Sequence, residues 1–285
     1  MTIEHGDELE VADLAPSRAA EVSVATMNNS VVRTILSIWG WLILGVSVLV
    51  FTPIVAIVRL ATMPFDKGAY AAGYVFRKVV IPLSKLNPLW SFRTSGELPD
   101  DMRRPYVVVA NHESFVDMIL ISHLPTEMKW LSKIEIMKLP FLGWMMRCAR
   151  DIPLVRGEKR SAIAALDECR ERLSQNVSVM IFPEGSRTNT GELNDFQAGA
   201  FKIAIEGQHP ILPMAVHGTR DALRKNDWRQ GPAVAEVRVL EPVPTEGLTK
   251  QDLDGLRDRV RTMISDARDD LRTEHGFVPP PPETS

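Results

Sequence analysis

His112 and Asp117 stand five residues apart, directly after the apolar run Tyr106–Ala110. A carboxylate bonded to one imidazole nitrogen fixes the tautomer and leaves the other nitrogen free to accept a proton. If the run is a strand that gives way to a helix, Asp117 can fold back over the first helical turn to reach His112. Such a pair could activate an alcohol as a general base, as the His–Asp pair of a hydrolase activates serine. The spacing alone is weak evidence, because purely structural His–Asp pairs are also common.

A second polar segment, residues 182–188 (Phe-Pro-Glu-Gly-Ser-Arg-Thr), directly follows the apolar run Val177–Ile181. Both segments would lie at the carboxyl ends of strands, where α/β proteins place their sites. Gly185 allows the backbone to approach a ligand closely, and Arg187 could bind a phosphate through two hydrogen bonds. The alternative is an ordinary strand-to-helix turn with a surface arginine. Ser186 is not expected to be a nucleophile, because the second glycine of G-x-S-x-G is missing.

Two cations and a thiol are further candidates. Lys133 and Arg156 lie on either side of the apolar stretch Met137–Met146, and Arg156 follows the short apolar run Ile152–Val155. They could bind a ligand or be ordinary solvated charges. Cys148 is a weaker candidate for a nucleophile. The sequence contains no H-E-x-x-H, no Cys/His cluster and no phosphate-binding P-loop, so neither a metal site nor nucleotide hydrolysis is predicted.

The elements that would position these residues alternate between strand and helix patterns. This alternation predicts an α/β fold with a mixed, largely parallel sheet flanked by helices. Thr249 and Asp252 resemble an N-cap with its acidic partner, at the start of a closing helix that extends to Leu271. The expected strands are Tyr106–Ala110, Met128–Leu131, Val177–Phe182, Ile211–Val216 and Val234–Leu240.

The segment Thr34–Val58 carries no charge, and it is longer than the ~20 apolar residues that a membrane-spanning helix needs. The alternative is a buried core helix. Pro53 could kink the helix or mark the turn of a hairpin within one leaflet. The membrane is expected to be the plasma or inner membrane. Basic residues are more frequent after the segment than before it, which predicts that the bulk of the protein faces the cytoplasm. Residues 64–90 could form an interfacial helix on anionic headgroups or a helix packed on the core.

Four regions are expected along the 285-residue chain: an acidic disordered tail (1–29), membrane-anchoring and interfacial helices (30–95), a catalytic domain (96–271) and a disordered proline-rich tail (272–285). The net charge of -3 argues against a general nucleic-acid-binding protein. The two cysteines, Cys148 and Cys169, cannot form a disulfide framework or a C-x-x-C site.

The motifs in combination resemble the glycerolipid acyltransferases, and most of all the bacterial lysophosphatidate acyltransferases. The resemblance rests on the order Asn-His-x-x-x-x-Asp, an arginine after Ile152–Val155, Phe-Pro-Glu-Gly-Ser-Arg-Thr and Leu-Pro-Met-Ala-Val, and it covers about residues 87–271. It implies the glycerolipid acyltransferase fold, with His112 as base and Asp117 as its orienting partner. The acceptor-binding residues that it implies are Arg156, Glu184, Gly185 and Arg187, with Lys133 as a weaker candidate. One departure is Phe196-Gln197-Ala198-Gly199, where the family often has Phe-Lys-x-Gly.

The resemblance implies transfer of a fatty acyl group from a thioester, acyl-CoA or an acyl carrier protein, to the free hydroxyl of lysophosphatidic acid. A thioester is already activated, so no cofactor is expected; the partners would be the thioester, a lysophospholipid and the bilayer. One alternative is a phospholipid–lysophospholipid transacylase or another glycerolipid acyltransferase. Another is a catalytically silent membrane protein that binds lipid.

Overall fold

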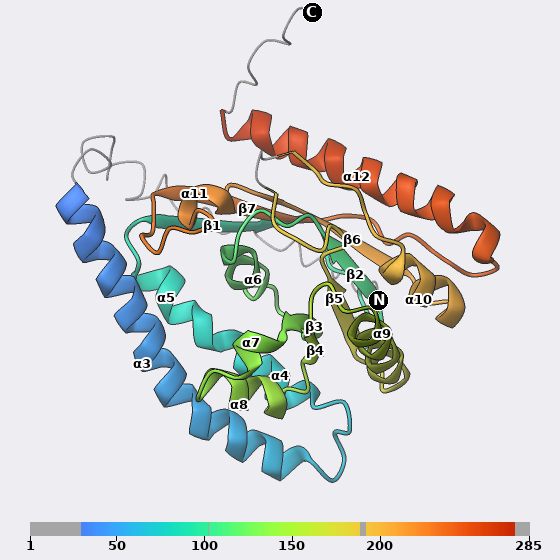
Figure 1. Cartoon of the computed structure of the whole chain (residues 1–285), viewed down its shortest axis with the longest axis horizontal. Helices are drawn as coiled ribbons and strands as arrows, with labels where there is room; N and C mark the ends of the chain where they lie inside the picture. Colours follow the sequence, from blue (N-terminus) through green and yellow to red (C-terminus); the bar gives the residue numbers. More distant parts are fainter. Residues whose placement is uncertain (1–29, 102, 189–191, 277–285) are drawn as a thin grey trace, which may run out of the picture.

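The structure is a computed structural model that describes residues 30–101, 103–188 and 192–276. Within these residues seven strands form one sheet, in the order β1-β7-β6-β2-β5-β3-β4 (Figure 1). Every neighbouring pair is parallel except β6 and β7. The carboxyl ends of β2 to β6 therefore share one edge with the amino ends of β1 and β7. The strands are Trp90–Ser95 (β1), Val107–Ala110 (β2), Met128–Lys133 (β3), Ile152–Leu154 (β4), Ser178–Ile181 (β5), Ile211–His217 (β6) and Ala233–Val239 (β7).

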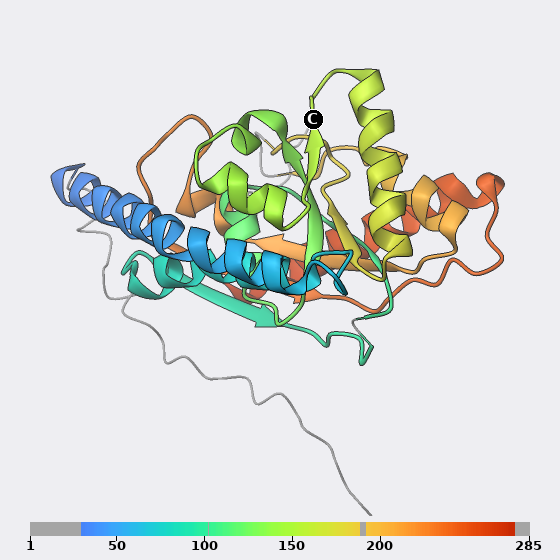
Figure 2. The ribbon, with the colours of Figure 1, turned by 90° about the horizontal axis from the view of Figure 1, so that it is seen from below.

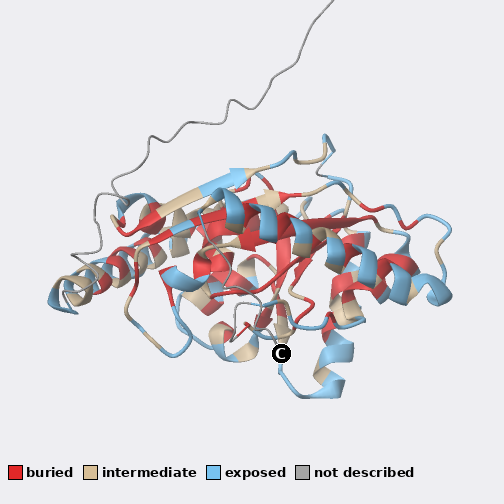
Figure 3. Ribbon diagram, turned by 90° about the horizontal axis from the view of Figure 1, so that it is seen from above, coloured by how far each residue is buried: buried red, intermediate tan, exposed pale blue. Residues whose placement is uncertain are grey.

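Helices cover both faces of the sheet, so its central strands are apolar on both sides, and Figure 3 shows these central strands as buried. Strand β2 illustrates the alternation: Val107 and Val109 belong to one apolar cluster, Val108 and Ala110 to another. The first cluster includes residues of α9 (Lys159–Ser174), α10 (Gly199–Gly207) and α12 (Leu253–Glu274). The second includes residues of α6 (Val116–Ile121).

The long helix α3 (Ser30–Thr62) lies along the outside of the domain (Figures 1 and 2). Its packed face is built mainly from small residues, and its outer face is apolar and exposed. A helix that meets water has the opposite arrangement, with a polar outer face. By length and composition α3 could cross a membrane, with a mean hydropathy of 2.6 over its most apolar window. Buried on it are Ser37, Gly40, Ile43, Ser47 and Val55; exposed on it are Val31, Ile35, Ile38, Leu42, Val46, Leu49, Ile54, Ile57 and Leu60.

Contacts hold α3 to the domain over both of its halves. Arg33 donates to the carbonyl oxygens of Arg229 and Gln230, each at 3.0 Å, and the indole of Trp41 donates to the carbonyl of Trp228 at 2.8 Å. The second half packs in an apolar cluster with α4 (Tyr70–Arg77) and α8 (Leu142–Cys148). The helix continues unbroken past Pro53, so the alternative of a hairpin turn at that residue is wrong.

Residues 64–90 do not form one interfacial helix. They contain α4, the 3-10 turn η1 (Lys78–Val80) and α5 (Ile81–Leu86), and no residue from 68 to 84 is exposed. The alternative of helices packed on the core therefore describes them better. The chain then enters β1, an edge strand that the sequence interpretation had included in the anchoring region.

The closing helix begins as expected, with a capping box between Thr249 and Asp252 that starts η2 (Lys250–Asp252) and α12. Helix α12 continues to Glu274, beyond the expected end of the catalytic domain at residue 271. The tails expected at 1–29 and 272–285 lie outside the described residues, apart from 272–276. Short helices α7 (Ile134–Met137) and α11 (Thr219–Ala222) complete the fold.

Candidate active site

The His112–Asp117 pair lies on the loop between β2 and α6, at the carboxyl edge of the sheet. Strand β2 ends at Ala110 and α6 begins at Val116, which places Asp117 in the first turn of the helix. The Nδ1 atom of His112 lies 2.7 Å from Oδ2 of Asp117, and both side chains are buried. The structure thus brings together the two residues whose spacing suggested a general base.

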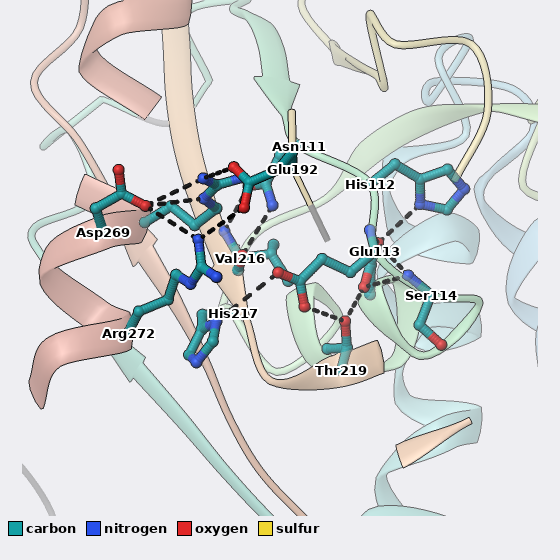
Figure 4. A network of polar contacts seen from close by, with 12 residues as sticks. Asn111, His112, Glu113, Ser114, Glu192, Val216, His217, Thr219, Asp269 and Arg272 are labelled. Carbon is teal, nitrogen blue, oxygen red and sulfur yellow. Dashed lines mark hydrogen bonds and ion pairs between the residues drawn. The ribbon is translucent and has the colours of Figure 1, made fainter. Parts of the chain in front are cut away.

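Four donors converge on the buried carboxylate of Asp117. The backbone N–H groups of Glu113 and Ser114 donate to it at 2.8 and 3.1 Å, and the hydroxyl of Thr219 donates to Oδ1. Figure 4 labels these three donor residues and His112, which is the fourth. These bonds compensate for the burial of the charge, and Nδ1 of His112 must carry a proton to donate as well. The Nε2 atom of His112 is then the acceptor, and it has no hydrogen-bond partner among the described residues.

The second polar segment packs directly against His112. The ring of Phe182 stacks on the imidazole with centroids 4.1 Å apart and an angle of 18° between the planes. The backbone N–H of His112 donates to Oε1 of Glu184 at 2.7 Å, and that of Thr188 donates to the carbonyl of His112 at 3.0 Å. The loops after β2 and β5 are therefore bonded to each other, as the expected convergence of the two motifs requires.

Both carboxylate oxygens of Glu184 are occupied by backbone donors. His112 N–H bonds one oxygen, and Asn194 N–H bonds the other at 2.9 Å. Burial raises the pKa of Glu184, and these two N–H groups act against that rise. The resemblance implied that Glu184 contacts the acceptor. In the structure its contacts join two loops beside the imidazole, and its contact with an acceptor stays a prediction.

Three of the residues expected to bind the acceptor line one hollow of about 140 Å³, here called the Arg156 hollow. Lys133 ends β3, Arg156 follows β4 and Gly185 follows β5, so three neighbouring strands deliver them to the same place. Gly185 has φ +69°, and Gln197 lies over it so closely that an added Cβ would be 2.5 Å from Nε2 of Gln197. Gln197, which stands where the family often has lysine, also lines this hollow.

Arg187 does not line the Arg156 hollow, although it follows Gly185 by two residues. Its side chain is half-buried, and within the described part of the chain no hydrogen bond or ion pair holds its guanidinium. Lys133 is exposed and makes only a long contact, 3.7 Å, with Glu135. These cations are therefore available to an anion, since an exposed pair of this kind stabilises little.

A third feature is an apolar slot of about 110 Å³ on the α3 side of the site, here called the apolar slot. Phe115 and Met118, just after the His112 motif, form one part of it, and Leu44 and Val48 of α3 form another. The slot therefore connects the region next to His112 with the helix that carries the exposed apolar face.

The cysteines lie in apolar surroundings. Cys148 packs against the cluster shared by α3, α4 and α8. Cys169 is buried on α9, and burial raises the pKa of its thiol to about 12. In the described ranges no group of three or more His, Cys, Asp or Glu side chains is arranged to hold a metal ion.

Sequence reasoning missed two contributors to the site. The sequence placed Phe182 at the end of an expected strand and at the start of a motif, but it did not predict that the ring stacks on His112. Thr219 reaches Asp117 across 102 positions of sequence, so no local pattern could have assigned it.

The His112–Asp117 pair, whose second imidazole nitrogen has no described partner, thus lies beside both a cationic hollow and an apolar slot. The family model described as "Acyltransferase" matches residues 92–217, the stretch that holds both polar segments.

The curated relatives that this chain resembles over part of its length are 1-acyl-sn-glycerol-3-phosphate acyltransferases. It is 38% identical over 160 residues to human 1-acyl-sn-glycerol-3-phosphate acyltransferase alpha, covering 55% of this chain and 56% of the relative. The yeast 1-acyl-sn-glycerol-3-phosphate acyltransferase is 32% identical over 168 residues, 58% of this chain and 55% of the relative. The chain thus spans little more than half the length of these curated relatives.

A solved structure has the same fold over nearly all of its length. It is the crystal structure of the 1-acyl-sn-glycerophosphate (LPA) acyltransferase PlsC from Thermotoga maritima, with a TM-score of 0.70 and 25% sequence identity. The match covers 84% of this chain and 96% of that one. The mixed, largely parallel sheet expected from the sequence is thereby confirmed.

Proposed function

We propose that this protein transfers a fatty acyl group from a thioester, acyl-CoA, to the free hydroxyl of lysophosphatidic acid and so makes phosphatidic acid. The observation that carries the proposal is the geometry of His112, whose Nδ1 is bonded to Asp117 while Nε2 has no described partner. The matching family model and the names of the relatives support the same substrates.

In the proposed reaction Nε2 of His112 takes the proton of the acceptor hydroxyl. At the same time the hydroxyl oxygen attacks the carbonyl carbon of the thioester. The tetrahedral intermediate then collapses, the C–S bond breaks, and the imidazolium returns the proton to the leaving thiolate. General-base help of this kind contributes about 10²–10⁴-fold to a rate. Asp117 keeps the tautomer that the first step needs and stabilises the imidazolium that forms.

The acceptor phosphate is proposed to bind at the Arg156 hollow, with Arg187 approaching from its edge. Lys133 and Arg156 are like charges that face one hollow, an arrangement that an anion would stabilise. The acyl chain is proposed to occupy the apolar slot. Because residues of α3 line this slot, the chain could enter it directly from a lipid layer.

Membrane association is supported by the inverted polarity of α3, whose exposed apolar face would be stable against lipid and not against water. We propose that the protein is bound to the plasma or inner membrane with its catalytic domain on the cytoplasmic side. Retention of the protein in the membrane fraction after a high-salt wash would support this, and its release into the soluble fraction would contradict it.

The test of the activity uses purified full-length protein in detergent, labelled acyl-CoA and a panel of lysophospholipids, with His112→Ala as the matched variant. The expected result is labelled phosphatidic acid from lysophosphatidic acid, and its loss in His112→Ala protein that keeps its fold and membrane binding. Transfer that requires a diacyl phospholipid donor would indicate a transacylase instead. A lack of thioester cleavage with every acceptor would indicate a lipid-binding protein, and full turnover by His112→Ala would refute the base.

A further inference from the structure

A second, larger hollow lies at the same edge of the sheet and has no place in the scheme above. It measures about 870 Å³ and is here called the Arg220 hollow. It is formed by the segment that follows β6, by the amino end of β7 and by the carboxyl end of α12. Small-molecule sites are typically about 300–1,000 Å³, so this hollow is large enough for a nucleotide, whereas the Arg156 hollow is not.

The Arg220 hollow and the Arg156 hollow flank His112. In the sheet, β2 carries His112 and has β6 on one side and β5 on the other. The Arg156 hollow follows β5, β3 and β4, and the Arg220 hollow follows β6. Figure 4 shows Glu113, which lines the Arg220 hollow, pointing toward His217 and Thr219 while His112 points the other way. Thr188, which also lines it, is bonded to the backbone of His112 at 3.0 Å.

Cationic side chains predominate on the lining of this hollow. Arg220, Arg224, Lys225 and Arg272 are lining residues, against the acids Glu113 and Asp221. Arg272 is also paired with Glu192 at 3.3 Å and with Asp269 at 3.5 Å, so its charge is partly compensated by acids outside the lining. Of the two lining acids, Glu113 is buried and turned to His217 and Thr219, and Asp221 makes an exposed 3.4 Å pair with Arg224. An exposed pair contributes about 0–1 kcal/mol, so a phosphate can compete for that arginine.

We propose that the Arg220 hollow binds the phosphorylated nucleotide of the coenzyme A thioester. This rests on the proposed acyl transfer, since direct transfer requires the donor and the acceptor to be bound at the same time. Both carry phosphates, each worth about -1.5 to -2 charge when it is a monoester, so they need separate cationic sites. Arginines suit such groups because the planar guanidinium binds a phosphate through two hydrogen bonds. The imidazole lies between the two sites, where thioester and hydroxyl must meet.

The test is a steady-state comparison of the double variant Arg220→Gln/Arg224→Gln with the wild type in detergent. The matched control is Arg257→Gln/Arg259→Gln on α12, which removes the same charge from a surface that lines none of the three hollows described. The KM for acyl-CoA is expected to rise tenfold or more in the first variant and to stay within twofold in the control. The KM for lysophosphatidic acid, and turnover with an acyl-pantetheine that lacks the nucleotide, are expected to stay within twofold.

Other outcomes overturn the site. An unchanged KM for acyl-CoA, an equal loss with acyl-pantetheine, or a rise confined to the KM for lysophosphatidic acid would each do so. A rise found only with a carrier-protein thioester would identify a protein donor as the occupant and reject the nucleotide. Calorimetric binding of CoA separates this proposal from the activity: wild-type protein that binds CoA, with loss of binding in Arg220→Gln/Arg224→Gln, supports the site even if no acyl transfer is found.

Discussion

Two buried polar clusters of the protein differ in whether one of their polar atoms is left without a described hydrogen-bond partner. One is the His112–Asp117 pair. The other, here called the Arg77 cluster, joins Arg77 of α4 to Glu127, Lys129 and Asp151, which lie in or next to β3 and β4. Arg77 donates to Glu127 at 3.1 Å and to Asp151 at 3.0 Å, and Lys129 donates to Glu127 at 2.7 Å. Buried ions are stable only when partners of this kind compensate for lost hydration.

In the Arg77 cluster every charged side chain is paired with an opposite charge of the protein. Two cations face two carboxylates, the Met128 carbonyl accepts from Arg77 at 3.0 Å, and the Ala69 carbonyl accepts from Lys129 at 2.9 Å. Burial lowers the pKa of Arg77, but the carboxylates of Asp151 and Glu127 outweigh burial and raise it. The His112–Asp117 pair has the same kind of buried carboxylate but leaves Nε2 of His112 without a described partner. The difference between the two clusters is therefore the atom without a described partner, more than the buried charge, and that atom lies at the proposed reactive site.

The largest effect is expected from Asp117→Asn. The amide can no longer favour the Nδ1–H tautomer, so the acceptor lone pair on Nε2 is lost, and kcat should fall by about 10²–10⁴-fold. Turnover of purified enzyme with acyl-CoA and lysophosphatidic acid measures this. A kcat within threefold of the wild type would mean that Asp117 does not orient the base.

Arg77→Met should instead destabilise the fold, by about 3–5 kcal/mol, because it leaves Glu127 and Asp151 with an uncompensated buried charge. Activity per folded molecule should be retained. Thermal unfolding in detergent, followed by turnover of the folded fraction, separates the two effects. Arg257→Met, which removes an arginine from largely exposed ion pairs on α12, is the control and should change stability by at most about 1 kcal/mol.

Thr219→Val removes one of the four donors to Asp117 with almost no change of shape. A lost hydrogen bond to a buried charge is worth about 1.5–3 kcal/mol, so kcat should fall about 4- to 12-fold if half of that acts through the imidazole. Thr219 is a positioning residue, and the KM values for both substrates should stay the same. Thr219→Ser should restore the rate. A loss of stability with an unchanged kcat would assign the hydroxyl to structure alone.

The smallest effect concerns His123, which is bonded to the Ile119 carbonyl and to Ser84 outside both clusters. Burial lowers its pKa, so the folded protein resists a proton that the unfolded chain accepts below pH about 6.5. Stability should therefore be complete above that pH and fall as the pH drops toward the folded-state pKa. His123→Gln should make the decline of Tm between about pH 7 and 5.5 shallower. Because burial also lowers the pKa of His209, part of the slope should remain; an unchanged slope would contradict the role of His123.

The sequence predicted the central strands and both polar segments because apolar β-branched runs followed by polar residues are local patterns. It did not predict β1, whose Trp-Ser-Phe-Arg-Thr-Ser is half exposed and pairs with β7, as in Trp90 with Ala233. Edge strands lack the continuous apolar run, and their partner is distant in sequence. The same distinction applies to the site: contacts between residues close in sequence could be predicted, and contacts between distant residues could not. The His112–Asp117 contact spans five residues, whereas the bonds of Asp117 with Thr219 and of Glu184 with His112 depend on the finished fold.

The packing of α3 bears on how the enzyme can be handled. Membrane-bound proteins are often prepared without detergent by deleting an apolar helix near the N-terminus. Here that deletion would remove Leu44 and Val48 from the lining of the apolar slot. It would also remove the hydrogen bond from Arg33 to the Gln230 carbonyl. It would expose a strip of core to water as well. A shortened chain that begins after Thr62 should therefore aggregate, and nanodiscs or mild detergents are the better route to a working preparation.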